Sequence, residues 1–185
     1  MENYLLEKLP TSLQIRGRSY PIDTDFRTWI QINELCLNGQ IRPIMDAVTR
    51  LFRKEDLEEL HEVPGSEILD AVSDFLLCQK KGNLKKDGRP PAFSYTYDSD
   101  YIIAAFQEFY HIDLISIDHM HWFRFNLLLN SMSSDSELKE RVRYRSINLA
   151  TIKDPKQRSR IRKIQQSIRL PSRALDDAEI GANME

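Results

Sequence analysis

The chain has 185 residues, of which 41% are hydrophobic and 29% charged, and its net charge at pH 7 is −2. This composition is typical of a globular protein and suits one ordinary domain, so we expect a single domain over residues 1–170. The near-neutral charge gives no overall reason to expect a polyanionic partner, and no apolar run reaches the roughly 18 residues that span a bilayer.

The first predicted element is a β-hairpin over residues 12–22. Leu13 and Ile15 alternate with polar neighbours, Gly17-Arg18 supplies a turn, and the alternation then resumes from Tyr20. A two-stranded hairpin is marginal on its own in water, so it must pack against an apolar surface.

A helix is predicted directly after the hairpin. Asp23 or Thr24 can cap its start, and Asn38-Gly39 stops it after about Leu37. Its expected inward side chains are Phe26, Trp29, Ile30 and Cys36.

Two further helices show the i, i+3, i+4, i+7, i+8 spacing of a single apolar face. One has Pro43 in its first turn, and the other follows a break at Pro64-Gly65. The inward residues of the first are Ile44, Ala47, Val48, Leu51 and Phe52. Those of the second are Ile68, Ala71, Val72, Phe75 and Leu76.

The segment 80–92 differs in character from its neighbours. Its run KKGNLKKDGRPP holds five basic residues, two glycines and two prolines, with a single leucine. Such a segment cannot bury enough apolar surface to order itself, so we expect a mobile loop within the domain.

Residues 93–132 are rich in aromatic side chains and predict two helices. Asp98 is expected to cap the first, and Asp118 the second, which should be central to the core because it is apolar on most sides. The inward stripe of the first is Ile102, Ala105, Phe106 and Phe109. The seam of the second is Trp122, Phe125, Leu129 and Met132, widened by Phe123, Leu127 and Leu128.

The next predicted helix carries Leu138 and Val142. Ser134 with Glu137 three residues later forms a capping box at its start. The complete pattern predicts a mostly α fold, with about six to seven helices in one domain and a small N-terminal β-hairpin.

The last predicted helix is basic and covers residues 154–170. Asp154-Pro155 starts it and Pro171 ends it, and we expect residues 171–185 to form a flexible acidic tail.

Cys36 and Cys78 both fall on predicted buried helix faces. The acidic start of the chain lacks the basic residues and apolar stretch of a signal peptide. Two free thiols in a reducing cytosol are therefore favoured over a disulfide.

No group of residues predicts a catalytic, cofactor or metal site. His119 and His121 would point roughly 200° apart on a helix, whereas helical metal ligands lie three or four residues apart. The sequence has no glycine-framed serine and no glycine loop of the kind that binds phosphate. Five acidic residues fit capping and solvation better than acid–base catalysis, and we expect no enzyme. They are Asp98, Asp100, Glu108, Asp113 and Asp118.

The basic helix is the clearest candidate for binding. Between Lys153 and Arg173 the sequence has eight positive residues against Asp154 alone. They are Lys153, Lys156, Arg158, Arg160, Arg162, Lys163, Arg169 and Arg173.

Three interpretations of this helix stay open. Arg158, Arg162 and Arg169 share one face and can contact nucleic-acid phosphates. The isoleucines of another face can instead dock on a protein partner while the charges stay solvated, or the helix is simply a solvated one. The narrow apolar stripe and the lack of interleaved aromatics favour a protein over nucleic acid. The isoleucines are Ile161, Ile164 and Ile168.

Tyr95, Tyr97 and the aromatic residues of the two central helices are expected mainly in the core, with some lining a groove for an apolar helix. Eight residues from these helices and from the basic helix are therefore our candidates for partner binding. They are Tyr101, Phe109, Trp122, Phe123, Arg158, Ile161, Arg162 and Ile168.

The runs FSYTYDSDYIIAAFQEFYHIDL and HMHWFRFNLLLNSM, with VRYRSINL and the upstream IDTDFRTWIQI, resemble the "gene product fifteen" family of tailed bacteriophages and of prophages in Gram-positive bacteria. The resemblance covers roughly residues 13–170. Its most specific elements are Tyr-Asp-x-Asp-Tyr-Ile from Tyr97, Ile112-Asp113-Leu114, and His121-Trp122. One departure is His111, where family members often have a glycine.

What the resemblance implies is tail morphogenesis. Such a protein is expected to act as a tail assembly chaperone that coats the helical tape-measure protein until the tail tube polymerises, and then leaves. The resemblance implies a non-enzymatic protein in the cytoplasm of the bacterial host, absent from the mature virion, that binds the tape-measure protein and itself but no membrane. The alternative is a phage protein that binds nucleic acid through the basic helix.

Overall fold

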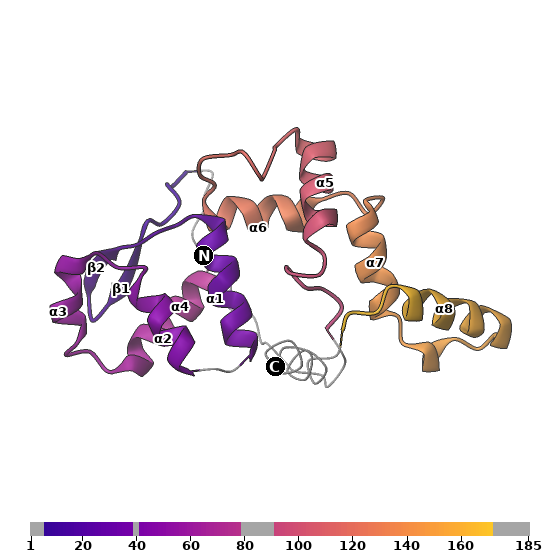
Figure 1. The fold of residues 1–185 in the computed structure, drawn as a ribbon, viewed down its shortest axis with the longest axis horizontal. Helices are drawn as coiled ribbons and strands as arrows, with labels where there is room; N and C mark the ends of the chain where they lie inside the picture. The colour runs from indigo at the N-terminus through magenta and orange to yellow at the C-terminus, as the bar shows by residue number, and fades with distance from the viewer. Residues whose placement is uncertain (1–5, 39–40, 79–90, 172–185) are drawn as a thin grey trace, which may run out of the picture. The chain divides into compact units, whose positions relative to one another are not determined.

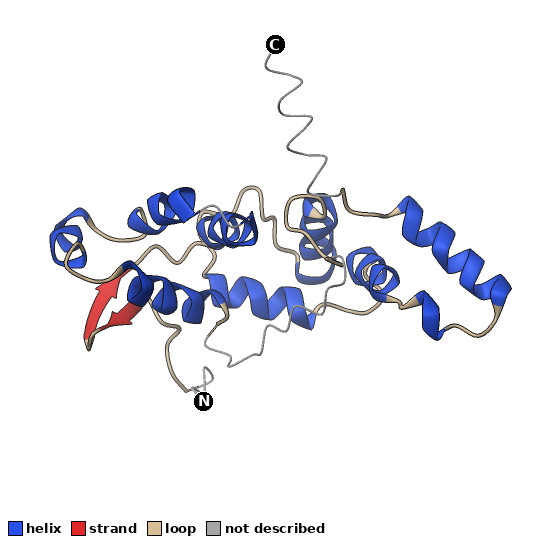
Figure 2. Ribbon diagram, turned by 90° about the horizontal axis from the view of Figure 1, so that it is seen from below, coloured by secondary structure: helices blue, strands red, loops and turns tan. Residues whose placement is uncertain are grey.

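The computed structural model describes residues 6–38, 41–78 and 91–171 (Figure 1). These residues form eight α-helices, two short 3-10 helices and one two-stranded antiparallel sheet (Figure 2). The mostly α fold with a small hairpin is confirmed, and the extra helix is a single turn in the charged stretch before Pro64. Most of the predicted loop 80–92 and nearly all of the tail 171–185 lie outside the described residues.

The chain divides into two compact units. The described part of unit 1 comprises residues 6–38, 41–78 and 117–130, and that of unit 2 comprises 91–116 and 131–171. The single domain over residues 1–170 stays a prediction. The elements assigned to unit 1 are β1 (Ser12–Ile15), β2 (Arg18–Pro21), α1 (Phe26–Asn38), α2 (Ile41–Thr49), η1 (Lys54–Asp56), α3 (Leu57–Leu60), α4 (Gly65–Leu76) and α6 (Trp122–Ser131). Those of unit 2 are α5 (Ser99–Tyr110), α7 (Glu137–Ser146), η2 (Leu149–Thr151) and α8 (Pro155–Ser167).

The hairpin forms where it was predicted, with Leu13 opposite Tyr20 and both side chains buried. Its turn residues are Arg16 and Gly17 rather than Gly17-Arg18, because Ile15 pairs with Arg18 across the turn. Arg16 has a φ of 51° and Gly17 a φ of 77°, and two positive φ values are what a tight hairpin turn of matching twist requires.

The cap of α1 is Asp25, not Asp23 or Thr24. The Asp25 carboxylate accepts a hydrogen bond from the Arg27 backbone N–H at 3.0 Å. Asp23 instead accepts bonds from the Asp25 N–H and the Thr28 hydroxyl. Asp25 was not among the predicted caps, but it stands directly before Phe26, where a capping carboxylate can reach the first free N–H groups of the helix.

Asp118 does not cap α6, which begins four residues later at Trp122. The backbone around Met120 instead pairs with the start of α1: Phe26 N–H donates to the Met120 carbonyl at 2.9 Å, and Trp122 N–H donates to the Thr24 carbonyl at 2.8 Å. This pairing keeps the segment extended, so the helix cannot start at Asp118.

His121 takes the capping position of α6. Its Nδ1 accepts a hydrogen bond from the Phe123 N–H at 3.1 Å, and its Nε2 lies 2.8 Å from the Pro10 carbonyl oxygen. A carbonyl only accepts, so Nε2 carries the proton and the ring is neutral. Burial lowers the pKa of His121, and the nearby His119 lowers it further, against the opposing effect of the Pro10 bond.

Large aromatic side chains fill the core of unit 1. Trp29 packs on Phe75 with ring centroids 4.3 Å apart, and Phe26 stacks on Phe125 at 4.7 Å. Trp122 is buried, and its indole N–H donates to the Leu76 carbonyl at 3.0 Å. Most of the residues predicted to face inward from α1, α2 and α4 are therefore buried.

Three predicted burials fail, one of them at Tyr97, which is 46% exposed. Leu127 of α6 is 61% exposed, so the side of this helix that carries it faces solvent. Cys36 is exposed although it lies on the side of α1 that carries Trp29, because the core ends before the last turn, where Leu37 is also 51% exposed. Cys36 and the half-buried Cys78 form no disulfide, as predicted.

Helix ends in unit 2 follow local rules. His111 ends α5 with a φ of 53°, the left-handed conformation that favours glycine, which explains why a glycine suits this position. Ser136, not Ser134, caps α7, since its hydroxyl accepts from the Lys139 N–H at 3.3 Å. Asp154 caps α8 as predicted, accepting from the Lys156 N–H at 2.9 Å.

Candidate partner-binding surface

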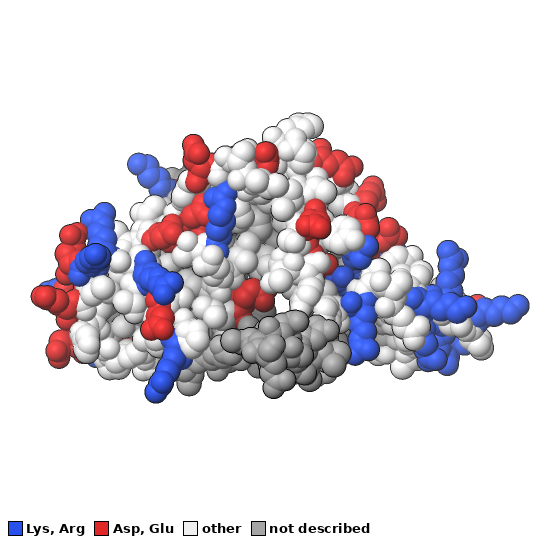
Figure 3. Space-filling model, in the orientation of Figure 1, with Lys and Arg blue, Asp and Glu red and all other residues white. Residues whose placement is uncertain are grey.

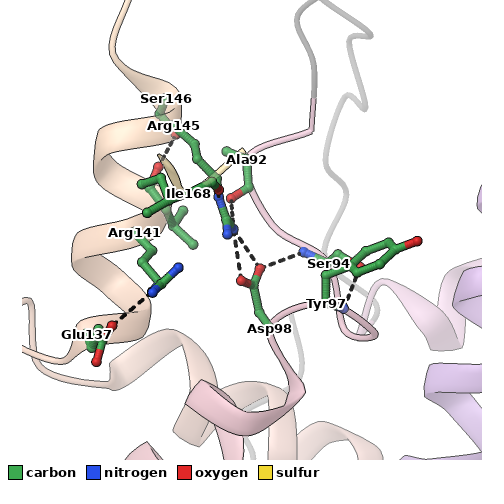
Figure 4. A network of polar contacts seen from close by, with 10 residues as sticks. Ala92, Ser94, Tyr97, Asp98, Glu137, Arg141, Arg145, Ser146 and Ile168 are labelled. Carbon is green, nitrogen blue, oxygen red and sulfur yellow. Dashed lines mark hydrogen bonds and ion pairs between the residues drawn. The ribbon is translucent and has the colours of Figure 1, made fainter. Parts of the chain in front are cut away.

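A buried ion pair lies at the start of α5 (Figure 4). Asp98 precedes the helix, but its carboxylate makes no capping bond, so the prediction of capping and solvation is wrong. Both oxygens instead accept from Nη1 of Arg145 on α7, at 2.9 and 2.8 Å, and Oδ2 also accepts from the Ser94 N–H at 3.0 Å. The Asp98 side chain is 0% exposed and that of Arg145 is 8% exposed, so the carboxylate turns away from water to meet a guanidinium.

Arg145 connects three segments of unit 2. Besides Asp98, its Nη1 donates to the Ala92 carbonyl at 3.2 Å, and its Nε donates to the Ile168 carbonyl, just after α8, at 2.6 Å. One guanidinium therefore holds the approach to α5, the start of α5 and the end of α8. Removing one partner of a buried pair costs more than the intact pair contributes, because a charge is left without compensation.

A second arginine of α7 holds Tyr101. The Arg141 guanidinium lies over the Tyr101 ring, 3.9 Å from its centroid, and its Nε donates to Glu137 at 3.0 Å. Tyr101, a predicted partner-binding residue, is half-buried and packs within unit 2. Its ring fixes α5 against α7 rather than standing free for a partner.

Polar contacts also attach α8 to the segment before it. Gln165 Nε2 donates to the Tyr144 and Ile147 carbonyls at 2.9 and 2.8 Å. Arg158 donates from Nε and Nη2 to the Ile152 carbonyl at 3.0 and 2.6 Å. No residue of α8 is fully buried, so hydrogen bonds to carbonyls, rather than a core, fix its position.

The isoleucines and the charges of α8 are accessible to a partner. Ile161, Ile164 and Ile168 are only half-buried, on the same side of the helix as Arg158 and Gln165. Lys and Arg side chains gather over this helix in Figure 3. The exposed cations of the helix and its ends are Lys153, Lys156, Arg160, Arg162, Lys163 and Arg169.

The eight predicted partner-binding residues separate into three groups. Trp122 and Phe123 are 1% and 4% exposed and belong to the core, so they present no surface in this structure; their helix packs these rings against other aromatics. Tyr101 and Phe109 are half-buried on α5. The remaining four lie on or directly after α8, where three are half-buried and one is exposed. They are Arg158, Ile161, Ile168 and Arg162.

Sequence reasoning missed the Asp98–Arg145 pair. The two residues are 47 positions apart, and an aspartate before a helix normally indicates a cap. The only sequence signal is that Asp98 stands among aromatic residues while Arg145 lies in a helix whose other arginines have local acidic partners.

Within the described ranges, no group of three or more His, Cys, Asp and Glu side chains is arranged to hold a metal ion. None of the described helices has the length and apolar character needed to cross a membrane.

Comparison with family models matches residues 5–170 to the family described as "Bacteriophage Gp15 protein". The chain belongs to this family. Two of the motifs that carry the resemblance meet in this structure, because Tyr-Asp-x-Asp-Tyr-Ile supplies Asp98 and VRYRSINL supplies its partner Arg145. Comparison of this family member with curated proteins and with solved structures gives no match.

Proposed function

We propose that this protein is a non-enzymatic tail assembly chaperone that binds the tape-measure protein before the tail tube polymerises. Membership of a bacteriophage family carries the proposal. The protein acts in the cytoplasm of the infected host and leaves before the virion is complete.

The surface of α8 supports this role. Its half-buried isoleucines offer apolar area to a helix of the partner, and the exposed cations beside them keep the unbound surface soluble. A chaperone that must later leave needs a modest grip at each contact. Several copies along one long partner then bind firmly through avidity.

The experiment is co-expression with the tape-measure protein of the same phage, followed by a solubility assay and co-purification. The wild-type chain should keep the tape-measure protein soluble and co-purify with it. The variant Ile161→Ser/Ile164→Ser should lose most of this binding, whereas Leu127→Ser, an exposed leucine of unit 1, should retain it. A tape-measure protein that stays insoluble with the wild-type chain, and forms no complex, contradicts the proposal.

The exposed cations of α8 favour one alternative, a nucleic-acid-binding phage protein. Arg158 is a poor phosphate ligand because its guanidinium already donates to the Ile152 carbonyl. The matched test therefore reverses Arg160 and Arg162 to Glu and measures retention on DNA and RNA across a salt series. Binding by the wild type that weakens steeply with salt and disappears in the variant would favour the alternative.

A further inference from the structure

The charges of unit 2 are segregated along the chain. All eleven of its described Lys and Arg residues lie between Lys139 and Arg169. The described residues of unit 2 before Lys139 contain only acidic charges, and they include α5 and the turn after it. These acidic residues are Asp98, Asp100, Glu108, Asp113, Asp135 and Glu137.

Many of these charges are used within the unit, and the remainder form two surfaces. Asp98 and Glu137 pair with arginines of α7. The acidic surface consists of the exposed residues Asp100 and Glu108 of α5 with Asp113 and Ile115 of the following turn. The basic surface consists of α8 with its exposed Arg160, Arg162 and Lys163 and its three half-buried isoleucines. Among the described residues, no hydrogen bond or ion pair joins the two surfaces.

An exposed isoleucine lies in the acidic surface. Ile115 is 75% exposed, and the turn that presents it is held by Asp113. Oδ1 of Asp113 accepts from the Ile115 N–H at 2.9 Å, and Oδ2 accepts from the Ser116 hydroxyl at 2.7 Å. The hydrogen bond from Ser116, followed by that from Ile115, lowers the pKa of Asp113, so the charge beside Ile115 persists.

We propose that the acidic surface of one copy of this chain binds the basic surface of a second copy. The two surfaces are opposite in charge, and each includes accessible isoleucine. Ile115 of one copy packs against the isoleucines of α8 in the next, while Asp100 and Glu108 approach Arg160 and Arg162. The second copy and the tape-measure protein therefore compete for the same face of α8, and the tape-measure protein displaces the second copy when it binds. Each copy carries one surface of each kind, so two copies either pair reciprocally in a two-fold dimer or continue head-to-tail into a ring or an open row.

The first measurement is the mass of the full-length chain in solution, by sedimentation or light scattering, at low and high salt. The wild type should form species larger than a monomer at about 50 mM NaCl, and should dissociate at about 1 M, where the screening length is roughly 3 Å. Ile115→Ser should weaken this association by about tenfold, because one apolar side chain is lost from the contact.

A charge exchange tests which surfaces meet. The acid-reversed variant is Asp100→Lys/Glu108→Lys, and the base-reversed variant is Arg160→Glu/Arg162→Glu. Each variant alone should be monomeric, because like charges then face each other. An equimolar mixture should associate again, since every contact between the two variants has opposite charges.

The control for the acid-reversed variant is Asp70→Lys/Asp74→Lys, which makes the same change in net charge at exposed positions of α4. It should associate like the wild type. If the two variants associate when mixed, the proposal is supported, and the result also shows that both variants are folded. A wild type that stays monomeric at low salt overturns it, as does an Ile115→Ser variant that associates as strongly as the wild type.

Discussion

The two units differ in what holds their helices in place. Among the described residues, unit 1 has nineteen buried apolar side chains, including two tryptophans and five phenylalanines, whereas unit 2 has six. Unit 2 relies instead on charge-assisted hydrogen bonds that converge on Arg145 and on carbonyls next to α8. The six buried apolar residues of unit 2 are Ile102, Ala105, Phe106, Leu114, Met132 and Leu138.

This difference separates a scaffold from a candidate binding element. Apolar packing is non-directional, and each buried side chain contributes about 1.5–3 kcal/mol, so the unit 1 core is robust to small shifts. Hydrogen bonds to a guanidinium are directional and lose their value when the geometry changes. We therefore expect α8 to open at lower free energy than the core of unit 1.

The largest expected effect comes from breaking the aromatic core. Trp29→Ala removes a fully buried indole that packs on Phe75, and should lower the free energy of unfolding by about 3–5 kcal/mol. Denaturant unfolding followed by tryptophan fluorescence and circular dichroism measures it. A loss below about 1 kcal/mol would mean that this cluster does not dominate the stability of unit 1.

Breaking the polar hub of unit 2 should have a somewhat smaller and more local effect. Arg145→Met leaves the buried Asp98 carboxylate unpaired and should cost about 3 kcal/mol. Amide hydrogen exchange should accelerate in α8 and at the start of α5, but not in α1 or α4.

The double variant Arg145→Met/Asp98→Leu is the matched control for this hub. It removes both charges, so it should recover part of the stability lost in the single variant. Equal losses of unfolding free energy in the single and double variants would show that the ion pair does not stabilise the contacts around Arg145.

Acidification should loosen unit 1 through His121. The folded state lowers the pKa of this residue below its ordinary value of 6.5, so the unfolded chain takes up the proton more readily. Stability is therefore complete above about pH 6.5 and falls as the pH drops towards the lower pKa of the folded state. Loss of the α6 cap should contribute about 1 kcal/mol.

The measurement for His121 is the free energy of unfolding between pH 5 and 7.5 in the wild type and in His121→Asn, which keeps a capping oxygen. The variant should show a flatter profile over this range. Identical profiles would contradict a role for His121 in the pH response.

The smallest expected effect lies at the contact between α5 and α7. Arg141→Ala removes the guanidinium over the Tyr101 ring and should destabilise unit 2 by about 0.5–1 kcal/mol. Arg141→Lys tests whether the flat guanidinium matters or only its charge. A variant as stable as the wild type would make the contact incidental.

The apolar pattern predicted most elements, but not their starts. Periodicity placed Val48, Phe75 and Phe106 inward correctly because a helical stripe is a local property of the sequence. The starts of α1 and α7 were assigned to the wrong residues because several capping residues stand close together before each helix. The start of α6 was placed too early because the Met120 backbone pairs with the start of α1, which a local pattern does not reveal.

The candidate site was predicted only in part. The sequence singled out α8 because charge and apolar spacing are visible in its residues. It could not separate core from surface among the aromatics, so Trp122 and Phe123 were offered as partner-binding residues although both are buried. The partner of Asp98 was also hidden, since contact between positions 47 residues apart depends on the folded arrangement.

The most direct test of the central claim, that α8 is the binding element and unit 1 the scaffold, is amide hydrogen exchange of the full chain with and without the tape-measure protein. Binding should slow exchange in α8 by about tenfold or more. The free helix opens at low free energy, and the bound tape-measure protein suppresses this opening. Exchange in α1 and α4 should stay unchanged. Protection that appears in unit 1 while α8 exchanges as fast as in the free chain would contradict the account.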